Sequence, residues 1–141
     1  MQKQPEILAP VGSEDALLAA VRCGADAVYF GAGACNARRN AGQFTGDALQ
    51  NAVRYCHARN VKVYVTVNTL VRDEELSLCA DTIREAAESG ADAIIVQDVG
   101  IAQLARRIAP DLEVHGSTQM SITSAEVHSF LLYQFFLENA F

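Results

Sequence analysis

The strongest hydrophobic pattern in the chain is the stretch VKVYVTVN, at residues 61–68. β-Branched and aromatic residues dominate it, and it lacks the clean alternation of apolar and polar positions that a half-exposed strand shows. Such a run is typical of a parallel strand covered by helices on both faces of its sheet. The stretch ends at Asn68, and ligands bind outside the carboxyl ends of parallel strands. The pattern therefore predicts a buried strand with a site at its end.

Shorter apolar runs alternate with helical periodicity along the rest of the chain, which predicts five consecutive βα units. The strands are expected at residues 6–10, 27–30, 61–68, 93–96 and 114–119. The candidate helix caps are Ser13, Thr45, Asp98 and a capping box from Thr123 to Glu126. A long glycine- and alanine-rich loop, residues 31–44, separates the second strand from the next helix.

An internal repeat supports this order. GADAVYFG begins at Gly24 and GADAIIVQ begins at Gly90, two βα units later. In each copy the glycine ends a helix and the aspartate sits in the turn before a strand, so the repeat has a structural reason. A repeated βα unit is typical of a (β/α)8 barrel of the TIM type, of which five units form only a part. The alternative is an open, flavodoxin-like sheet, which would complete its core in about this length.

Composition limits the choice of partners and compartment. The net charge of −6 gives the 141-residue chain no general electrostatic attraction to nucleic acid or anionic lipid, although it does not exclude a specific RNA contact. The sequence has neither a signal-peptide pattern nor an apolar run of membrane-spanning length, so we expect a cytoplasmic protein without a membrane partner.

The four cysteines contain no C-x-x-C pair, and their spacing predicts neither a zinc site nor a disulfide framework. Cys56 and Cys79 fall in helical patterns, where a buried apolar role is expected, and Cys35 is expected to be an ordinary loop thiol. No metal site is predicted in this segment.

Candidate functional residues follow from the rule that reactive groups lie at the carboxyl ends of barrel strands. Asn68 and Asp98 are catalytic candidates, and for Asp98 a structural role as the cap of the fourth helix is the alternative. Amides and a guanidinium suit a polar planar or anionic substrate. The predicted substrate-binding residues are Ser13, Asn36, Arg38, Gln97, Ser117 and Gln119.

His115 is the third catalytic candidate, either as an acid, base or ligand in the barrel mouth or as a hydrogen-bonded interior histidine. Ser117 lies two residues further on the same strand face, so a Ser117–His115 pair is a geometry to check. His57 is expected to face solvent. The sequence contains no HExxH, G-x-S-x-G or G-x-x-x-x-G-K motif.

Six segments, in order, carry a family resemblance: EILAPVGS, GADAVYFG, NARRNAGQF, VYVTVNTLVRDEEL, GADAIIVQDVG and HGSTQMSIT. Together they make the chain, from about Glu6 to Glu126, resemble the amino-terminal part of the peptidase U32 family of collagenase-like peptidases. The resemblance implies a (β/α)8-type barrel.

Three functions remain open under this resemblance. Some family members are described as proteases, which implies a polypeptide substrate. Others resemble hydroxylases of a transfer-RNA uridine or a ribosomal cytidine, or partners in ubiquinone hydroxylation, and these imply an iron-sulfur cluster held by cysteines beyond this segment. The third possibility is a non-catalytic binding fragment.

Residues 127–141 depart from the family pattern and are rich in aromatic and aliphatic residues. We interpret them as an aberrant apolar tail that follows a truncated barrel domain at residues 1–126. An open barrel edge beside such a tail predicts self-association, and the fragment alone is expected to be inactive.

Overall fold

The computed structural model describes residues 5–33, 35–37 and 44–132 of the chain. Strands and helices alternate as the sequence predicts, and most boundaries fall within two residues of the expected ones. The elements are β1 (Leu8–Pro10), α1 (Glu14–Arg22), β2 (Ala27–Gly31), α2 (Asp47–His57), β3 (Lys62–Val67), η1 (Asp73–Glu75), α3 (Leu76–Ser89), β4 (Ala93–Val96), α4 (Val99–Ile108), β5 (Glu113–Gly116), η2 (Thr118–Met120) and α5 (Ala125–Leu132).

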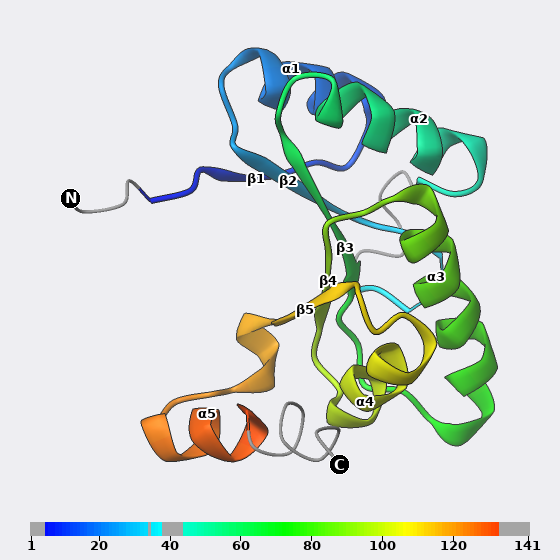
Figure 1. The fold of residues 1–141 in the computed structure, drawn as a ribbon, viewed down its shortest axis with the longest axis vertical. Helices are drawn as coiled ribbons and strands as arrows, with labels where there is room; N and C mark the ends of the chain where they lie inside the picture. The colour runs from blue at the N-terminus through cyan, green and yellow to red at the C-terminus, as the bar shows by residue number, and fades with distance from the viewer. Residues whose placement is uncertain (1–4, 34, 38–43, 133–141) are drawn as a thin grey trace.

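All five strands form one parallel sheet in the consecutive order β1-β2-β3-β4-β5. A flavodoxin-like sheet would place a later strand outside the first, so the observed order excludes that alternative. The strands line the inside of a C-shaped body and α1–α4 lie on its outside (Figure 1). This arrangement is a partial (β/α)8 barrel, which confirms the predicted fold class.

The central strand β3 is buried on both faces, as its sequence predicts. Val63, Val65 and Val67 are completely buried and belong to the main core beneath the helices. On the opposite, inner face, Tyr64 packs with alanines of β2 and β4 in a second, smaller cluster. Because neither face meets solvent fully, the strand fixes the position of its neighbours on both sides.

The two repeat aspartates join neighbouring strands at their amino ends. Asp26 accepts a hydrogen bond from the backbone N–H of Ile7 at 2.8 Å and donates its own N–H to the Ile7 carbonyl. Asp92 forms the same reciprocal pair with Val63, and its carboxylate accepts at 2.7 Å. His57 is exposed, as the sequence predicts, and its Nε2 also lies 2.8 Å from the same Asp92 oxygen.

Two of the predicted helix caps are confirmed. The Ser13 hydroxyl accepts from the N–H of Ala16 at the start of α1, and the Asp98 carboxylate accepts from the N–H of Gly100 at the start of α4. Both side chains therefore satisfy helix N–H groups that have no partner within the helix.

The other two cap predictions are wrong. Helix α2 begins after Gly46, not Thr45, and the Gly46 N–H donates to the Glu85 carboxylate of α3. At α5 the Ser124 hydroxyl accepts from the N–H of Val127, one residue beyond the predicted Thr123 cap. The start of α2 depends on a carboxylate from another helix, and the start of α5 depends on which of two adjacent hydroxyls is the cap. The local sequence does not distinguish these possibilities.

Cys35 and Cys79 form a disulfide between the segment after β2 and helix α3. This corrects the expectation of no disulfide. The two residues are 44 apart in sequence, but their Cα atoms are 5.8 Å apart because the segment folds back over α3. Cys56 is completely buried, as expected, and Cys23 is exposed.

The last described residue, Leu132, is also the last residue of α5. The predicted apolar tail begins at residue 127, inside this helix, and residues 133–141 lie outside the described residues. In the part of the chain that the structure describes, no helix is long and apolar enough to cross a bilayer.

Replacing Asp92 tests the role of the repeat aspartates. Asp92→Ala leaves the Val63 N–H without its acceptor and removes the His57 partner, so the free energy of unfolding should fall by about 1–3 kcal/mol. Urea denaturation measures this change. Asp81→Ala, which removes an exposed ion pair with Arg84 on α3, is the control and should cost about 0.5 kcal/mol or less. Equal losses in the two variants would contradict the assigned role.

Candidate functional site

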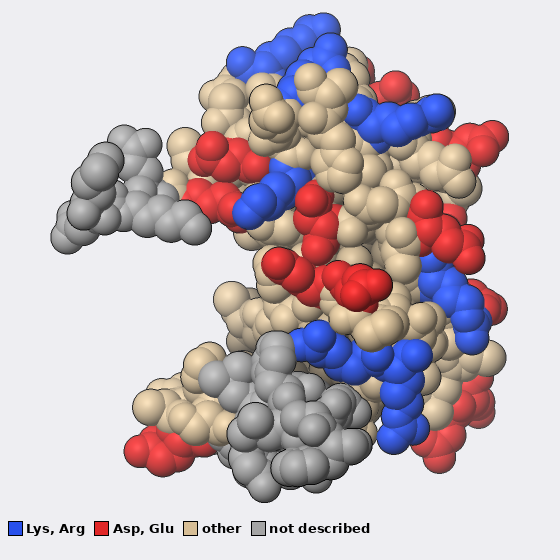
Figure 2. All heavy atoms as spheres, in the orientation of Figure 1, with Lys and Arg blue, Asp and Glu red and all other residues tan. Residues whose placement is uncertain are grey.

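A pocket of about 390 Å³ lies on the concave side of the sheet. Figure 2 shows the hollow on this side of the molecule. Inner-face residues of the strands and the segments that follow them line the pocket. These residues include Leu8, Tyr29, Gly31, Ala37, Thr66, Asn68, Ile95, Ser117, Thr118 and Gln119. It therefore occupies the carboxyl end of the sheet, where the sequence rule places the site.

Strand register sets which side chains reach this pocket. Gly31, Thr66, Ile95 and His115 are paired across β2 to β5 and form one row on the sheet. Alternate residues of a strand share a face, so Asn68 lies on the same face as Thr66, one step further along the chain. Gly31 in this row allows another segment of the chain to approach the strand closely.

Asn68 is brought into the pocket, as predicted. Its Oδ1 accepts a hydrogen bond from the N–H of Ala37 at 3.1 Å, which ties the end of β3 to the segment after β2. An amide whose oxygen is engaged in this way keeps its two N–H donors for a ligand.

Asn36 has a different position from the one expected of a substrate ligand. It is completely buried, and its Nδ2 donates to the carbonyl of Gly33 at 2.8 Å. A Cβ on Gly31 would lie 2.6 Å from the Asn36 side chain, so the absence of a side chain at Gly31 makes room for this packing. Asn36 therefore packs against the inner face of β2 at Gly31 and is not among the residues that line the pocket.

Ser117 and Gln119 lie together where β5 ends, and both line the pocket. The Ser117 hydroxyl accepts from the Gln119 N–H at 3.2 Å and so caps η2, while the Ser117 N–H donates to the Val96 carbonyl. This arrangement holds the turn against β4 and keeps the Gln119 side chain at the pocket.

His115 pairs with neighbours other than Ser117. Its Nε2 lies 3.2 Å from a Glu113 carboxylate oxygen, and its ring meets the Tyr64 ring edge-on at a centroid distance of 4.8 Å. Among the hydrogen bonds of the described residues, none joins His115 to Ser117. The pair that the sequence suggested is therefore not formed in this structure.

Three further candidates, Asp98, Gln97 and Ser13, are not among the residues that line the pocket. Asp98 accepts N–H bonds from Gly100 and from Val71, so its carboxylate holds the loop before α3 as well as the start of α4. Gln97 is half-buried directly before it, and Ser13 caps α1. Arg38 lies outside the described residues.

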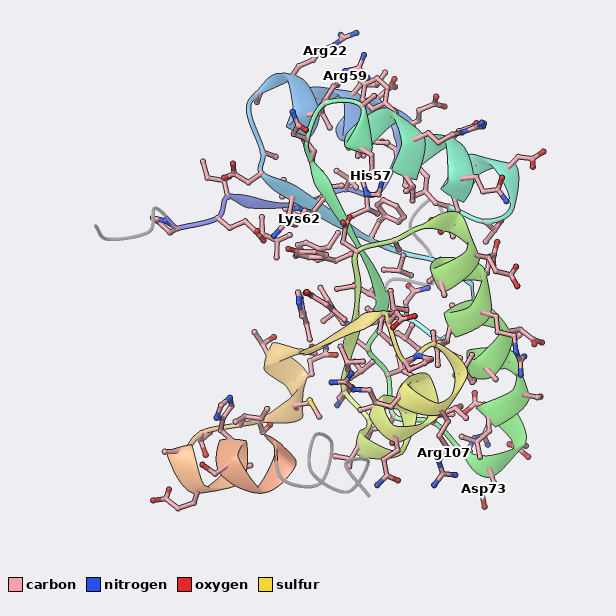
Figure 3. The ribbon with its side chains drawn as sticks, viewed as in Figure 1. Arg22, His57, Arg59, Lys62, Asp73 and Arg107 are labelled. Carbon is pink, nitrogen blue, oxygen red and sulfur yellow. A yellow bond between two sulfur atoms is a disulfide. The ribbon has the colours of Figure 1, made fainter. Side chains whose placement is uncertain are left out.

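A network of charged and aromatic residues lies below the pocket, toward the amino ends of the strands. Tyr64 donates its hydroxyl to Glu6 at 2.7 Å, and Lys62 Nζ lies 3.1 Å from the other Glu6 oxygen. Lys62 lies on the open side of the C-shaped body, away from α4, which carries Arg107 (Figure 3). The hydrogen bonds from Tyr64 and then from Lys62 lower the pKa of Glu6, while burial and the Glu6 contact raise the pKa of Tyr64.

Tyr29 and Thr66 are pocket residues that the sequence analysis missed. Each lies within two residues of a predicted strand end. Residues two apart in a strand share a face, so counting back two positions from Asn68 would have found Thr66. Tyr29 needed the strand register, because its exposure to the hollow depends on how β2 pairs with β3.

The cysteines of this segment do not fit an iron-sulfur cluster. Cys35 and Cys79 are bonded to each other, Cys56 is on the buried face of α2, and Cys23 is exposed at the end of α1. Such a cluster needs four thiolates converging on one point. Among the described residues, no group of three or more His, Cys, Asp or Glu is placed to hold a metal ion.

The fold and site together define a barrel-type α/β protein whose pocket lies at the carboxyl ends of its strands. The family model for peptidase family U32 matches residues 12–137. The chain therefore belongs to peptidase family U32.

Relatives of the chain carry two kinds of names. The collagenase of Porphyromonas gingivalis is 43% identical over 126 residues, covering 89% of this chain and 30% of the relative. The tRNA hydroxylation protein P1 of Bacillus subtilis is 37% identical over 122 residues, covering 86% of this chain and 29% of the relative. The chain thus spans less than a third of these curated relatives.

A solved structure supports the fold independently. The U32 peptidase Mk0906 superposes with a TM-score of 0.69 at 13% identity, covering 96% of this chain and 58% of that protein. At this level of identity the likeness concerns the fold alone.

The Glu6 network gives a pH prediction with a fixed sign. A carboxyl with a lowered pKa stabilises the folded state above its unfolded pKa and loses this contribution as pH falls through the folded pKa. Tyr64→Phe removes the largest cause, so the pKa of Glu6 should rise toward 4.5 and the acid-side loss of stability should become shallower. Carbon-detected NMR titration measures the pKa. Lys62→Met should shift it less, and an unchanged pKa in Tyr64→Phe would contradict the network.

Proposed function

We propose that this chain contributes the substrate pocket of an RNA-hydroxylating U32 protein, and that the pocket holds a nucleobase. The observation that carries this proposal is the combination in one pocket of an aromatic ring, Tyr29, with the amides of Asn68 and Gln119. A relative named as a tRNA hydroxylation protein supports the choice of RNA.

The chemistry of these side chains suits a planar polar ring. Bases that enzymes act on are commonly taken out of the stack, placed against aromatic or apolar side chains and read on their hydrogen-bonding edge. Tyr29 and Ile95 offer such surfaces, and Asn68 and Gln119 can donate to and accept from the carbonyl and N–H groups of a pyrimidine. The pocket volume of about 390 Å³ is adequate for a nucleoside.

Charge places a limit on what this segment contributes. With a net charge of −6, the chain offers little general attraction for phosphates, so the backbone of a bound RNA would be held mainly by other parts of the whole protein. In this proposal the segment selects the base, and the iron-sulfur chemistry implied for hydroxylating relatives is supplied by residues outside it.

Peptide hydrolysis is the second candidate, favoured by the 43% identical relative named collagenase. The same amides could hold the N–H and carbonyl groups of an extended polypeptide. The two candidate functions differ in the role of Tyr29. Its ring stacks on the base if the pocket binds RNA, whereas peptide hydrolysis does not require stacking on this ring.

The test measures affinity for an unmodified transfer RNA in three variants. Asn68→Ala and Gln119→Ala each remove one or two hydrogen bonds to the base, so the Kd should rise about 3- to 10-fold. Tyr29→Ala removes stacking and should raise it about 5-fold or more. Asn51→Ala, which changes an exposed amide on α2, is the matched control and should leave the Kd unchanged.

Collagen cleavage by the same proteins separates the candidates. If the variants keep their RNA affinity but lose collagen cleavage, the pocket serves a peptidase and the RNA proposal fails. RNA binding that depends on the pocket, without turnover of either substrate, would indicate the non-catalytic binding fragment.

A further inference from the structure

The Cys35–Cys79 disulfide fixes the part of the chain that forms one wall of the pocket. Cys35 lies in the segment that follows β2, and two residues on, Ala37 lines the pocket and donates its N–H to Asn68. Cys79 lies on α3, in the core, with no exposed surface. The bond therefore connects the rigid helical layer to the segment that orients the Asn68 amide.

Other contacts show how closely this segment lies on α3. A Cβ on Gly33 would come 2.5 Å from the Thr82 hydroxyl oxygen, and Thr82 is one helical turn from Cys79 on the same face of α3. Asn36, which belongs to this segment, is completely buried, and its Nδ2 donates to the Gly33 carbonyl. The segment is thus held by one covalent bond together with a few hydrogen bonds and close packing.

We infer that the Cys35–Cys79 disulfide is a redox-sensitive support of the pocket wall, and that its reduction by a dithiol loosens the contact between Ala37 and Asn68. A bond that closes a loop of this length restricts the chain strongly, and its loss gives the segment freedom that the remaining hydrogen bonds only partly limit. This inference goes beyond the proposed function and holds whether the pocket takes a base or a peptide.

The reaction is a two-electron thiol–disulfide exchange. A thiolate of the dithiol attacks the sulfur of Cys35, a residue of the segment that is 3% exposed where Cys79 is 0% exposed, and forms a mixed disulfide. The S–S bond to Cys79 breaks, and the Cys79 thiolate takes up a proton. The second thiol of the reductant then displaces Cys35, which leaves two protein thiols and an oxidised, cyclic reductant.

The other two cysteines are distinct from this pair. Cys23 is exposed at the end of α1, and Cys56 is on the buried face of α2, where burial raises the pKa of its thiol to about 11. Neither lies in the segment that lines the pocket, so they provide matched controls for cysteine replacement.

The first measurement tests whether the bond exists in the purified protein. A tryptic digest without reductant should contain residues 23–38 joined to residues 73–84, and the same joined peptide should remain in Cys23→Ser, which assigns the bond to Cys35. Free thiols at both Cys35 and Cys79 after mild oxidation would overturn the inference.

The second measurement follows the wall itself by hydrogen exchange in the wild-type protein, with and without dithiothreitol. Reduction should speed exchange at the Ala37 amide about tenfold or more, with little change at Val63 in the sheet centre, and reoxidation should restore the slow rate. Cys35→Ser should behave like the reduced protein and Cys23→Ser like the wild type. An unchanged rate at Ala37, or an equal rise across the sheet, would contradict a local support.

Discussion

The double burial of β3 is the constraint on which the rest of this structure depends. A strand without a solvent face must be covered on both sides, and the parallel βα units of this chain supply helices on one side and barrel-interior residues on the other. Val63, Val65 and Val67 meet that requirement on the helical face, and Tyr64 meets it on the inner face. The neighbouring strands then pair in chain order, so that all five carboxyl ends meet at one edge.

The candidate site is a consequence of that shared edge. Backbone groups and polar side chains that emerge from different strands bond to one another there: Ala37 to Asn68, and Ser117 to both Val96 and Gln119. These contacts give the pocket its rigidity at the points where a ligand would be recognised. At the opposite end, the reciprocal Asp26 and Asp92 pairs hold the amino ends of the strands in register. The amino ends of the strands therefore serve stability, and the carboxyl ends carry the candidate binding pocket.

Much of this arrangement could be predicted from the sequence. The fold was predictable from the strand at residues 61–68 and from the repeat at Gly24 and Gly90, because strand burial and helix termination leave recognisable patterns in the local sequence. Asn68 and Ser117 reach the pocket because each directly follows a strand, and Gln119 reaches it from the short turn η2 after β5. What could not be predicted depends on contacts between distant segments. The Cys35–Cys79 bond and the burial of Asn36 arise from a loop folding onto α3, and the Gly46 cap from a carboxylate on another helix.

Membership of peptidase family U32 gives the fold a context in which both hydrolytic and RNA-modifying names occur, and our proposed choice between them rests on the pocket. The most direct test is photo-crosslinking of the protein to transfer RNA that carries 4-thiouridine, followed by mapping of the crosslinked peptides. If the concave face selects a base, crosslinks will fall on pocket segments that contain Tyr29, Asn68 or Gln119. Crosslinks confined to the outer surfaces of α1–α4 would contradict the account.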